Sequence, residues 1–213
     1  MHVASPARSG RCAKEPTASA SGRAERARAF EALSERIRRC TRCPLARSRT
    51  HAVVYRGSLA PRVVFVGEAP GATEDREGLP FVGRSGRLLD RSIAGLGPQL
   101  GEYGLLNVLK CRPPANRFDR EAAATCRPYL DRQLELLAPR VLVPLGAIAW
   151  RALVPDGGPI LRAAGTPIRL GTRWAFPLLH PAAALRASRW RERWERDLLA
   201  FGRWLAETPV EML

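Results

Sequence analysis

The stretch "VVFVGEAPGATEDREGLPFVGRSGRLLD", residues 63–90, decides the fold class of this chain. It starts with an apolar run typical of a buried strand and ends with a pattern typical of a helix. Two prolines, five glycines and several carboxylates lie between the two. Turn-forming and charged residues directly after a buried strand predict a ligand-binding loop at the end of that strand.

The rest of the chain repeats this alternation of strand and helix. Further strands are expected at residues 104–110, 140–146 and 173–180. Helices are expected around residues 25–39, 83–97, 119–138 and 147–153, and a last helix carries a stripe that we expect in the core, Trp190, Trp194, Leu198, Phe201 and Leu205. The alternation predicts an α/β fold with three layers, α/β/α, around a central, mostly parallel, four-stranded sheet.

The length of 213 residues suits one domain with a substantial core. Residues 1–24 are rich in Ala, Ser, Arg and Pro, so we expect a disordered basic tail in which Cys12 is a spare thiol. Residues 25–213 are then expected to form the domain. The sequence shows no apolar segment of membrane-spanning length and no secretory signal, so a cytoplasmic protein is expected, in the bacterial cytoplasm or nucleoid.

The charge balance points to a polyanionic partner. The chain has 35 basic and 20 acidic residues, a formal net charge of +15. Such an excess favours nucleic acid, because contacts to phosphates release counterions. A solvated basic surface without a partner is the alternative. The enrichment in Arg over Lys can reflect codon bias and is given no weight.

The cysteines indicate a metal site rather than disulfides. Five cysteines are an odd number, which argues against a disulfide framework. Cys40 and Cys43 form a CxxC after the first expected helix, Cys111 is expected at the end of the second strand, and Cys126 in the helix that follows. Four thiolates can bind zinc or a [4Fe-4S] cluster, and the spacing does not separate the two. Four buried apolar cysteines are the alternative, which the Arg and Pro residues around the CxxC disfavour.

Ligands of such folds bind beyond the carboxyl ends of the strands. This rule places residues 67–81, 107–117 and 180–186 on one rim of the sheet. The "GEAPG" loop matches neither of the glycine-rich nucleotide motifs, so a nucleotide cofactor is unsupported.

Three side chains on this rim are candidates for a site. His180 stands at a strand end, where a structural role and a functional role are both open. Asn107 interrupts an apolar strand and must be hydrogen-bonded, either to backbone or to a ligand edge. Phe81 could pack in the core or stack on a ligand, and sequence alone favours the core.

Five motifs together resemble the family-4 uracil-DNA glycosylases, the iron–sulfur branch of the uracil-DNA glycosylase superfamily. The motifs, which span about residues 37–205, are "GEAPGATEDREGLPFVGRSGRLLD", "NVLKCRPPANR", "CRPYL", "VLVPLGAIA" and "LLHPAAALR". The resemblance implies a uracil-DNA glycosylase fold, a [4Fe-4S] cluster on the four cysteines, and uracil-containing DNA as the partner of a monomer. It also implies flipping of uracil out of DNA and hydrolysis of its N-glycosidic bond, which leaves an abasic site.

The resemblance also implies roles for individual residues. The amide of Asn107 would read O4 and N3–H of uracil, and Phe81 would stack on the base. His180 would donate to O2 as negative charge develops there. Backbone N–H groups of the loop that begins at Gly67 would assist, and Glu74 would close the pocket against a C5 methyl group.

The sequence departs from the superfamily pattern at two positions. Ala69 stands where some members carry a water-activating Asp, and the neighbouring Glu68 belongs to the same catalytic motif without an assigned role. Ala184 stands where the wedge into the minor groove is usually Leu, so Leu185 or Arg186 is expected to contact DNA. These departures keep open a non-catalytic or weakly active module that binds uracil or damaged DNA. A zinc-stabilised α/β protein with another partner is a third possibility.

Overall fold

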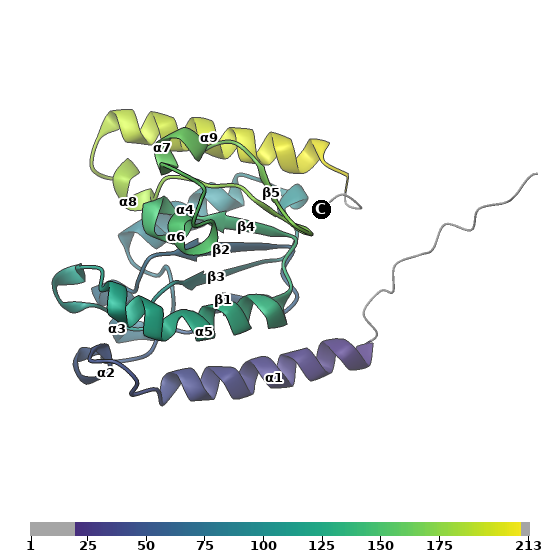
Figure 1. Cartoon of the computed structure of the whole chain (residues 1–213). Helices are drawn as coiled ribbons and strands as arrows, with labels where there is room; N and C mark the ends of the chain where they lie inside the picture. Colours follow the sequence, from purple (N-terminus) through teal and green to yellow (C-terminus); the bar gives the residue numbers. More distant parts are fainter. Residues whose placement is uncertain (1–19, 210–213) are drawn as a thin grey trace, which may run out of the picture.

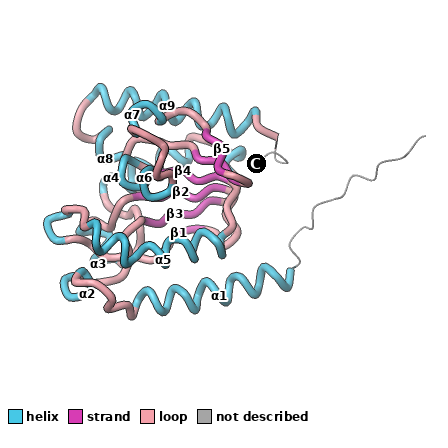
Figure 2. Tube along the Cα trace, viewed as in Figure 1, coloured by secondary structure: helices cyan, strands magenta, loops and turns pink. Residues whose placement is uncertain are grey.

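A six-stranded sheet forms the centre of the computed structural model, which describes residues 20–209 (Figures 1 and 2). The strand order is β1-β3-β2-β4-β6-β5. The strands are β1 (Arg56–Gly57), β2 (Val63–Gly67), β3 (Tyr103–Asn107), β4 (Val141–Pro144), β5 (Ile168–Leu170) and β6 (Arg173–Ala175). β2 pairs in parallel with β3 and β4, and β4 pairs in parallel with β6. β1 and β5 are antiparallel edge strands.

The structure confirms the α/β class and the mostly parallel sheet, whereas the expected count of four strands is wrong. The four inner strands correspond to the four expected apolar runs. The two additional strands, β1 and β5, have only two and three residues. Segments this short show no alternation of apolar and polar residues, and only their neighbours in the sheet make them strands.

Helices cover both faces of the sheet, as Figure 1 shows. The helix α1 packs on α5 along one face, and α9 packs with α8 and α4 on the other face. The helices are α1 (Ala20–Arg38), α2 (Leu45–Ser48), α3 (Ala72–Glu77), α4 (Arg84–Ala94), α5 (Arg120–Leu137), α6 (Gly146–Leu153), α7 (Ile160–Ala163), α8 (Pro181–Ala184) and α9 (Ser188–Glu207). The three layers follow from this arrangement. None of the helices within residues 20–209 has both the length and the apolar character to span a membrane.

The strand β2 contributes side chains to two hydrophobic cores, one on each face of the sheet. Val63 and Phe65 belong to the core under α4 and α9, and Val64 and Val66 to the core under α1 and α5. All four are completely buried, as expected for a strand with a helical layer on each face. This burial explains the continuous apolar run with which the decisive stretch begins.

Two expectations at the ends of the chain need correction. α1 begins at Ala20 rather than at residue 25, so residues 20–24 belong to a helix. Residues 1–19, Cys12 among them, lie outside the described residues. In the last helix, Trp194 is buried in the core, but Trp190 is only half-buried and the Arg189 guanidinium lies over its ring at 5.0 Å.

Candidate active site

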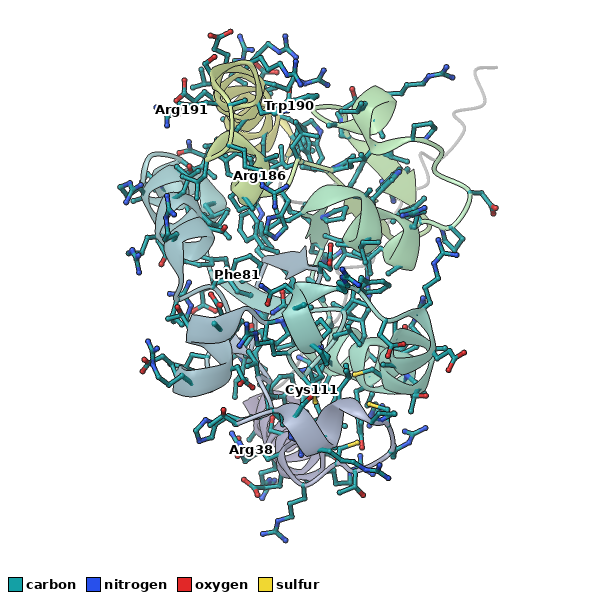
Figure 3. The ribbon with its side chains drawn as sticks, turned by 90° about the vertical axis from the view of Figure 1, so that its left-hand side faces the viewer. Arg38, Phe81, Cys111, Arg186, Trp190 and Arg191 are labelled. Atoms are coloured by element: carbon teal, nitrogen blue, oxygen red, sulfur yellow. The ribbon has the colours of Figure 1, made fainter. Side chains whose placement is uncertain are left out.

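The three expected rim segments meet at one cavity of about 580 Å³. Two of the residues that line it, Phe81 and Arg186, are labelled in Figure 3. Glu68, Ala69, Glu74, Phe81, Asn107, His180 and Arg186 all line it. The rule that ligands bind beyond the carboxyl ends of the strands therefore predicted the position of this cavity correctly.

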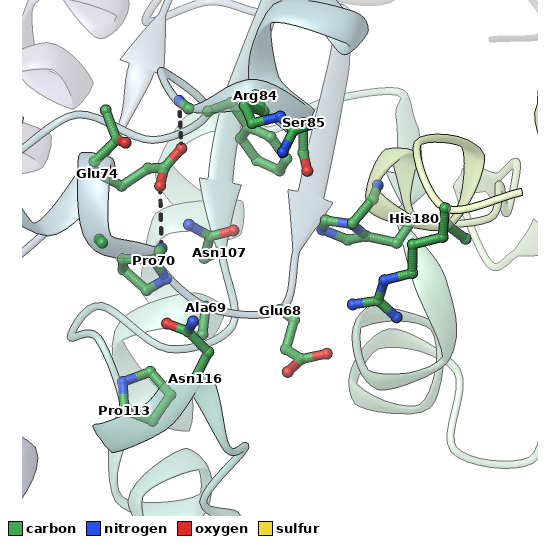
Figure 4. Close-up of a pocket in the computed structure, with 18 residues that line it drawn as sticks. Glu68, Ala69, Pro70, Glu74, Arg84, Ser85, Asn107, Pro113, Asn116 and His180 are labelled. Carbon is green, nitrogen blue, oxygen red and sulfur yellow. Dashed lines mark hydrogen bonds between the residues drawn. The ribbon is translucent and has the colours of Figure 1, made fainter.

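Asn107 is the last residue of β3, directly beside Gly67 in the neighbouring strand. Its side chain is 3% exposed, and its amide makes no hydrogen bond to another described residue. The amide points into the cavity (Figure 4), so its donor and acceptor are free for a ligand. A Cβ on Gly67 would lie 2.4 Å from Oδ1 of Asn107 and 2.5 Å from the Phe81 ring, so only glycine fits there. Gly67 itself does not line the cavity.

A buried lysine supports the backbone of Asn107. The ammonium group of Lys110, which is 1% exposed, donates to the carbonyl oxygen of Asn107. The next amide along the chain, that of Val108, donates to the carbonyl of Gly67 at 2.9 Å. The polypeptide around the free amide is therefore held from both sides.

His180 faces the same cavity from the opposite side (Figure 4). It is the N-cap of α8, and its Nδ1 accepts a hydrogen bond from the backbone N–H of Ala182 at 3.1 Å. Because a backbone N–H can only donate, Nδ1 carries no proton and the proton of the neutral ring is on Nε2. Burial lowers the pKa of His180 to about 4, and the nearby charge of Arg186 acts in the same direction. Near neutral pH the ring is therefore uncharged and offers Nε2–H as a donor.

The low pKa of His180 predicts how stability depends on pH. The ordinary pKa of 6.5 applies to the unfolded chain, so between pH 6.5 and about 4 the unfolded state binds more protons than the folded state. The free energy of unfolding is full above pH 6.5 and falls by up to about 3 kcal/mol as the pH falls through this window. Denaturant unfolding of His180→Gln should lack this part of the loss, whereas identical pH dependence in the two proteins would contradict the assignment.

Two glutamates complete the cavity. Glu68 is half-buried, its pKa is raised by burial, and its carboxylate accepts no hydrogen bond from another described residue. Glu74 accepts from the backbone N–H of Gly83 at 2.7 Å and of Gly71 at 3.1 Å (Figure 4). Glu74 therefore ties the loop before α3 to the loop before α4, and the Glu68 carboxylate remains available to a ligand or to water.

Leu185 and Arg186, the two residues expected to contact DNA, differ in their exposure and in their position relative to the cavity. Ala184, at the usual wedge position, is 2% exposed and belongs to the core. Leu185 is half-buried and does not line the cavity, whereas Arg186 is exposed and does. Ala69 lines the cavity beside Glu68 and offers no ionisable group to activate water.

Sequence reasoning did not single out several other residues that line the cavity, among them Arg84, Ser85, Pro113 and Asn116. Asn116 has a positive φ of 55° in the turn after β3 and accepts from the Arg112 side chain at 3.0 Å. Its place within the expected rim segment 107–117 was the signal that could have found it.

The four cysteines of the expected metal site line a second, smaller cavity. Cys40 and Cys43 lie between α1 and α2, and Cys126 lies in α5. Cys111 lies in the loop beyond β3 rather than at the end of the strand, because β3 ends at Asn107. All four are free thiols, and the sulfur atoms gather near Cys111 in Figure 3. Within residues 20–209, no group of three or more His, Cys, Asp or Glu side chains lies close enough together to hold a metal ion.

The surroundings of this second cavity are basic. Arg49 donates to Sγ of Cys111 at 3.1 Å, and the buried Lys110 also lines the cavity. Burial raises the pKa of the Cys111 and Cys126 thiols. Positive charge around a set of thiols is favourable for an anionic metal–thiolate group.

Comparisons with known proteins identify the family to which this chain belongs. The family model described as the uracil DNA glycosylase superfamily matches residues 54–200. The chain is 44% identical to a type-4 uracil-DNA glycosylase of Thermotoga maritima over 74% of this chain and 83% of the relative. It is 38% identical to a type-4 uracil-DNA glycosylase of Pyrobaculum aerophilum over 81% of this chain and 92% of the relative. A type-5 uracil-DNA glycosylase of the same organism is 34% identical over 46% of this chain and 50% of the relative. By these matches the chain belongs to the uracil DNA glycosylase superfamily and, within it, to the type-4 uracil-DNA glycosylases.

Proposed function

We propose that this protein is a DNA repair enzyme that hydrolyses the N-glycosidic bond of uracil in DNA. One observation carries the proposal: the unpartnered amide of Asn107 and the Nε2–H of neutral His180 face the same cavity. The type-4 relatives are named as glycosylases, which favours a catalyst over a module that only binds damage. The base lies inside a duplex, so it must be flipped into the cavity, at an unstacking cost of a few kcal/mol.

Base selection follows from the polarity of the Asn107 amide. Uracil presents the acceptor O4 beside the donor N3–H, which pair with the NH₂ and the carbonyl of one amide. Cytosine presents the reverse order and would leave two buried groups unpaired. The Phe81 ring, which is 5% exposed and lines the cavity, would stack on the base. The loops joined by Glu74 would leave no room for the C5 methyl of thymine.

The chemistry is stabilisation of the leaving group. As the glycosidic bond breaks, the sugar becomes an oxocarbenium-like cation and uracil gains negative charge on O2. His180 would donate Nε2–H to O2, an interaction worth about 3–4 kcal/mol if it acts like an oxyanion-hole donor. The free carboxylate of Glu68 faces the same space (Figure 4) and would hold the water that attacks the sugar. Arg186, exposed at the mouth, would contact the DNA backbone.

A [4Fe-4S] cluster would be held by Cys40, Cys43, Cys111 and Cys126, which line one cavity. The residue types fit, because four free thiols are the usual ligands of such a cluster. Since no three of these side chains lie close enough together to hold a metal ion within residues 20–209, cluster binding would have to draw the four sulfur atoms closer together. When bound, the cluster would cross-link three chain segments. Lys110 lines the cavity of the cysteines and donates to the carbonyl of Asn107. The cluster site would therefore also stabilise the end of β3, where the Asn107 amide would bind the base. The hydrolysis proposed above uses the side chains of Asn107, Phe81 and His180, and no step of it requires the cluster.

Iron content tests the cluster. Protein purified without oxygen is expected to be brown and to contain about four iron atoms per chain. Cys126→Ser should lose most of the iron, whereas Cys12→Ser, outside the proposed ligand set, should keep it. A colourless preparation with one zinc ion per chain would contradict the cluster and favour zinc.

An oligonucleotide assay tests the activity. The protein is incubated with single-stranded and duplex oligonucleotides that carry one uracil, and alkali then cleaves any abasic site. Cleavage at uracil, and not at cytosine or thymine in the same position, is the expected result. Intact strands together with tight binding would instead indicate the non-catalytic module.

We further propose that the protein is a monomer and that it acts in the cytoplasm. Size-exclusion chromatography would test the first statement, and cell fractionation the second.

A further inference from the structure

The backbone of Phe81 adopts an unusual conformation. Its φ is +59°, in the left-handed region that bulky residues rarely occupy. Such a conformation persists only where the surroundings enforce it, and it is often found at functional sites. The contacts to its backbone come from Arg56 and Gly86, which do not line the cavity.

An ion pair behind the cavity holds the Phe81 carbonyl. Nη2 of Arg56 donates to this carbonyl oxygen at 3.3 Å. The same guanidinium makes a two-pronged contact with Asp90 of α4, with Nη2–Oδ1 at 2.7 Å and Nη1–Oδ2 at 3.2 Å. Asp90 therefore fixes the orientation of Arg56, and Arg56 fixes the direction of the Phe81 peptide.

Close packing confines Phe81 on its other sides. A Cβ at Gly86 of α4 would lie 1.9 Å from the Phe81 carbonyl oxygen, so the turn is pressed directly against the helix. A Cβ at Gly67 would lie 2.5 Å from the ring. The ring itself lies nearly parallel to the His180 ring, with an interplanar angle of 26° and centroids 6.4 Å apart. These contacts confine both the backbone and the ring of Phe81 at the edge of the cavity.

We propose that Arg56 and Asp90 are positioning residues for base binding, acting through Phe81 without touching the substrate. The inference rests on the proposed function, because it assumes that the Phe81 ring stacks on the base. The pair joins the edge strand β1 to α4, and neither Arg56 nor Asp90 lines the cavity itself. Stacking acts on the bound base before and during bond cleavage, so its loss should weaken binding rather than slow chemistry.

Two variants test the proposal. Asp90→Asn keeps the shape of the side chain and removes its charge, and Arg56→Lys keeps the charge and removes the two-pronged contact. Each should raise KM for a uracil oligonucleotide and the inhibition constant of free uracil about tenfold, with kcat within about twofold of wild type. Asp90→Glu should restore most of the affinity. In a Phe81→Leu background, Asp90→Asn should have no further effect on KM, because the pair acts through the ring.

The matched control is Asp131→Asn, which breaks the Arg127–Asp131 pair of 2.6 Å on α5, away from the cavity. This variant should leave KM and the inhibition constant unchanged, and thermal unfolding of all variants reports stability separately. Wild-type KM and inhibition constants in Asp90→Asn and Arg56→Lys would overturn the inference, as would losses that add to that of Phe81→Leu. If Asp90→Asn does not fold, KM and the inhibition constant of Arg56→Lys alone test the inference. Absence of uracil excision by the wild-type protein would contradict the proposed function instead.

Discussion

Asn107→Asp is expected to reduce single-turnover excision of uracil on the order of 10³-fold, the largest effect of any single substitution at this site. The carboxylate has no NH₂ group to donate to O4, and its second oxygen faces that acceptor. The donor and acceptor of Asn107 are bonded to no other described residue, so nothing in the cavity replaces them. The ratio of cytosine to uracil excision should rise, because the N4 amine of cytosine can donate to a carboxylate.

A matched control separates base reading from a general loss of stability. Gln133 is a second buried amide, and its Nε2 donates to the carbonyl of Val54 at 3.0 Å, outside the cavity. Gln133→Glu should lower the free energy of unfolding by about 1–3 kcal/mol and leave the preference for uracil over cytosine intact. Unchanged selectivity in Asn107→Asp would exclude Asn107 from base recognition.

His180→Ala is expected to lower kcat by about 10²–10³-fold, because it removes the donor to the oxygen on which negative charge develops. Affinity for uracil-containing DNA should change little, since the donor matters most in the transition state. The tautomer fixed by the N–H of Ala182 predicts that a donor is enough, without a positive charge. His180→Gln should therefore retain more activity than His180→Ala.

The control for this prediction is His51, the other histidine within residues 20–209. Its Nδ1 lies 3.1 Å from the carbonyl oxygen of Asp75, outside the cavity. His51→Ala should keep wild-type kcat. Full activity of His180→Ala, or an equal loss in both variants, would contradict the role of His180 as donor to O2.

The sequence predicts best what depends on local pattern. A strand that helices cover on both faces must be apolar at every position, so the continuous apolar run at residues 63–67 predicts a central strand. The rule that ligands bind at carboxyl ends of strands then brings Asn107 and His180 to one rim. The short edge strands escaped prediction, because Arg56–Gly57 has no periodicity and becomes a strand only by pairing with β3.

Contacts between distant segments explain most of what the sequence could not reveal. Nothing in the pattern around Arg56 or Asp90 indicates that they meet at the carbonyl of Phe81. Lys110 belongs to an apolar run, and only the fold shows that its ammonium group supports Asn107. Trp190 fits the helical stripe of core residues, yet it is only half-buried in the structure. The neutral state of His180 likewise depends on burial and on the backbone of α8.

The most direct test of the central claim is a crystal structure with a short DNA strand that carries 2′-fluoro-2′-deoxyuridine. The fluorine destabilises the cationic sugar, so the bond survives long enough to be seen. The base is expected in the cavity against the Phe81 ring, with O4 and N3–H toward the Asn107 amide and O2 toward Nε2 of His180. A uracil bound elsewhere, or one that reaches only one of these two side chains, would contradict the account.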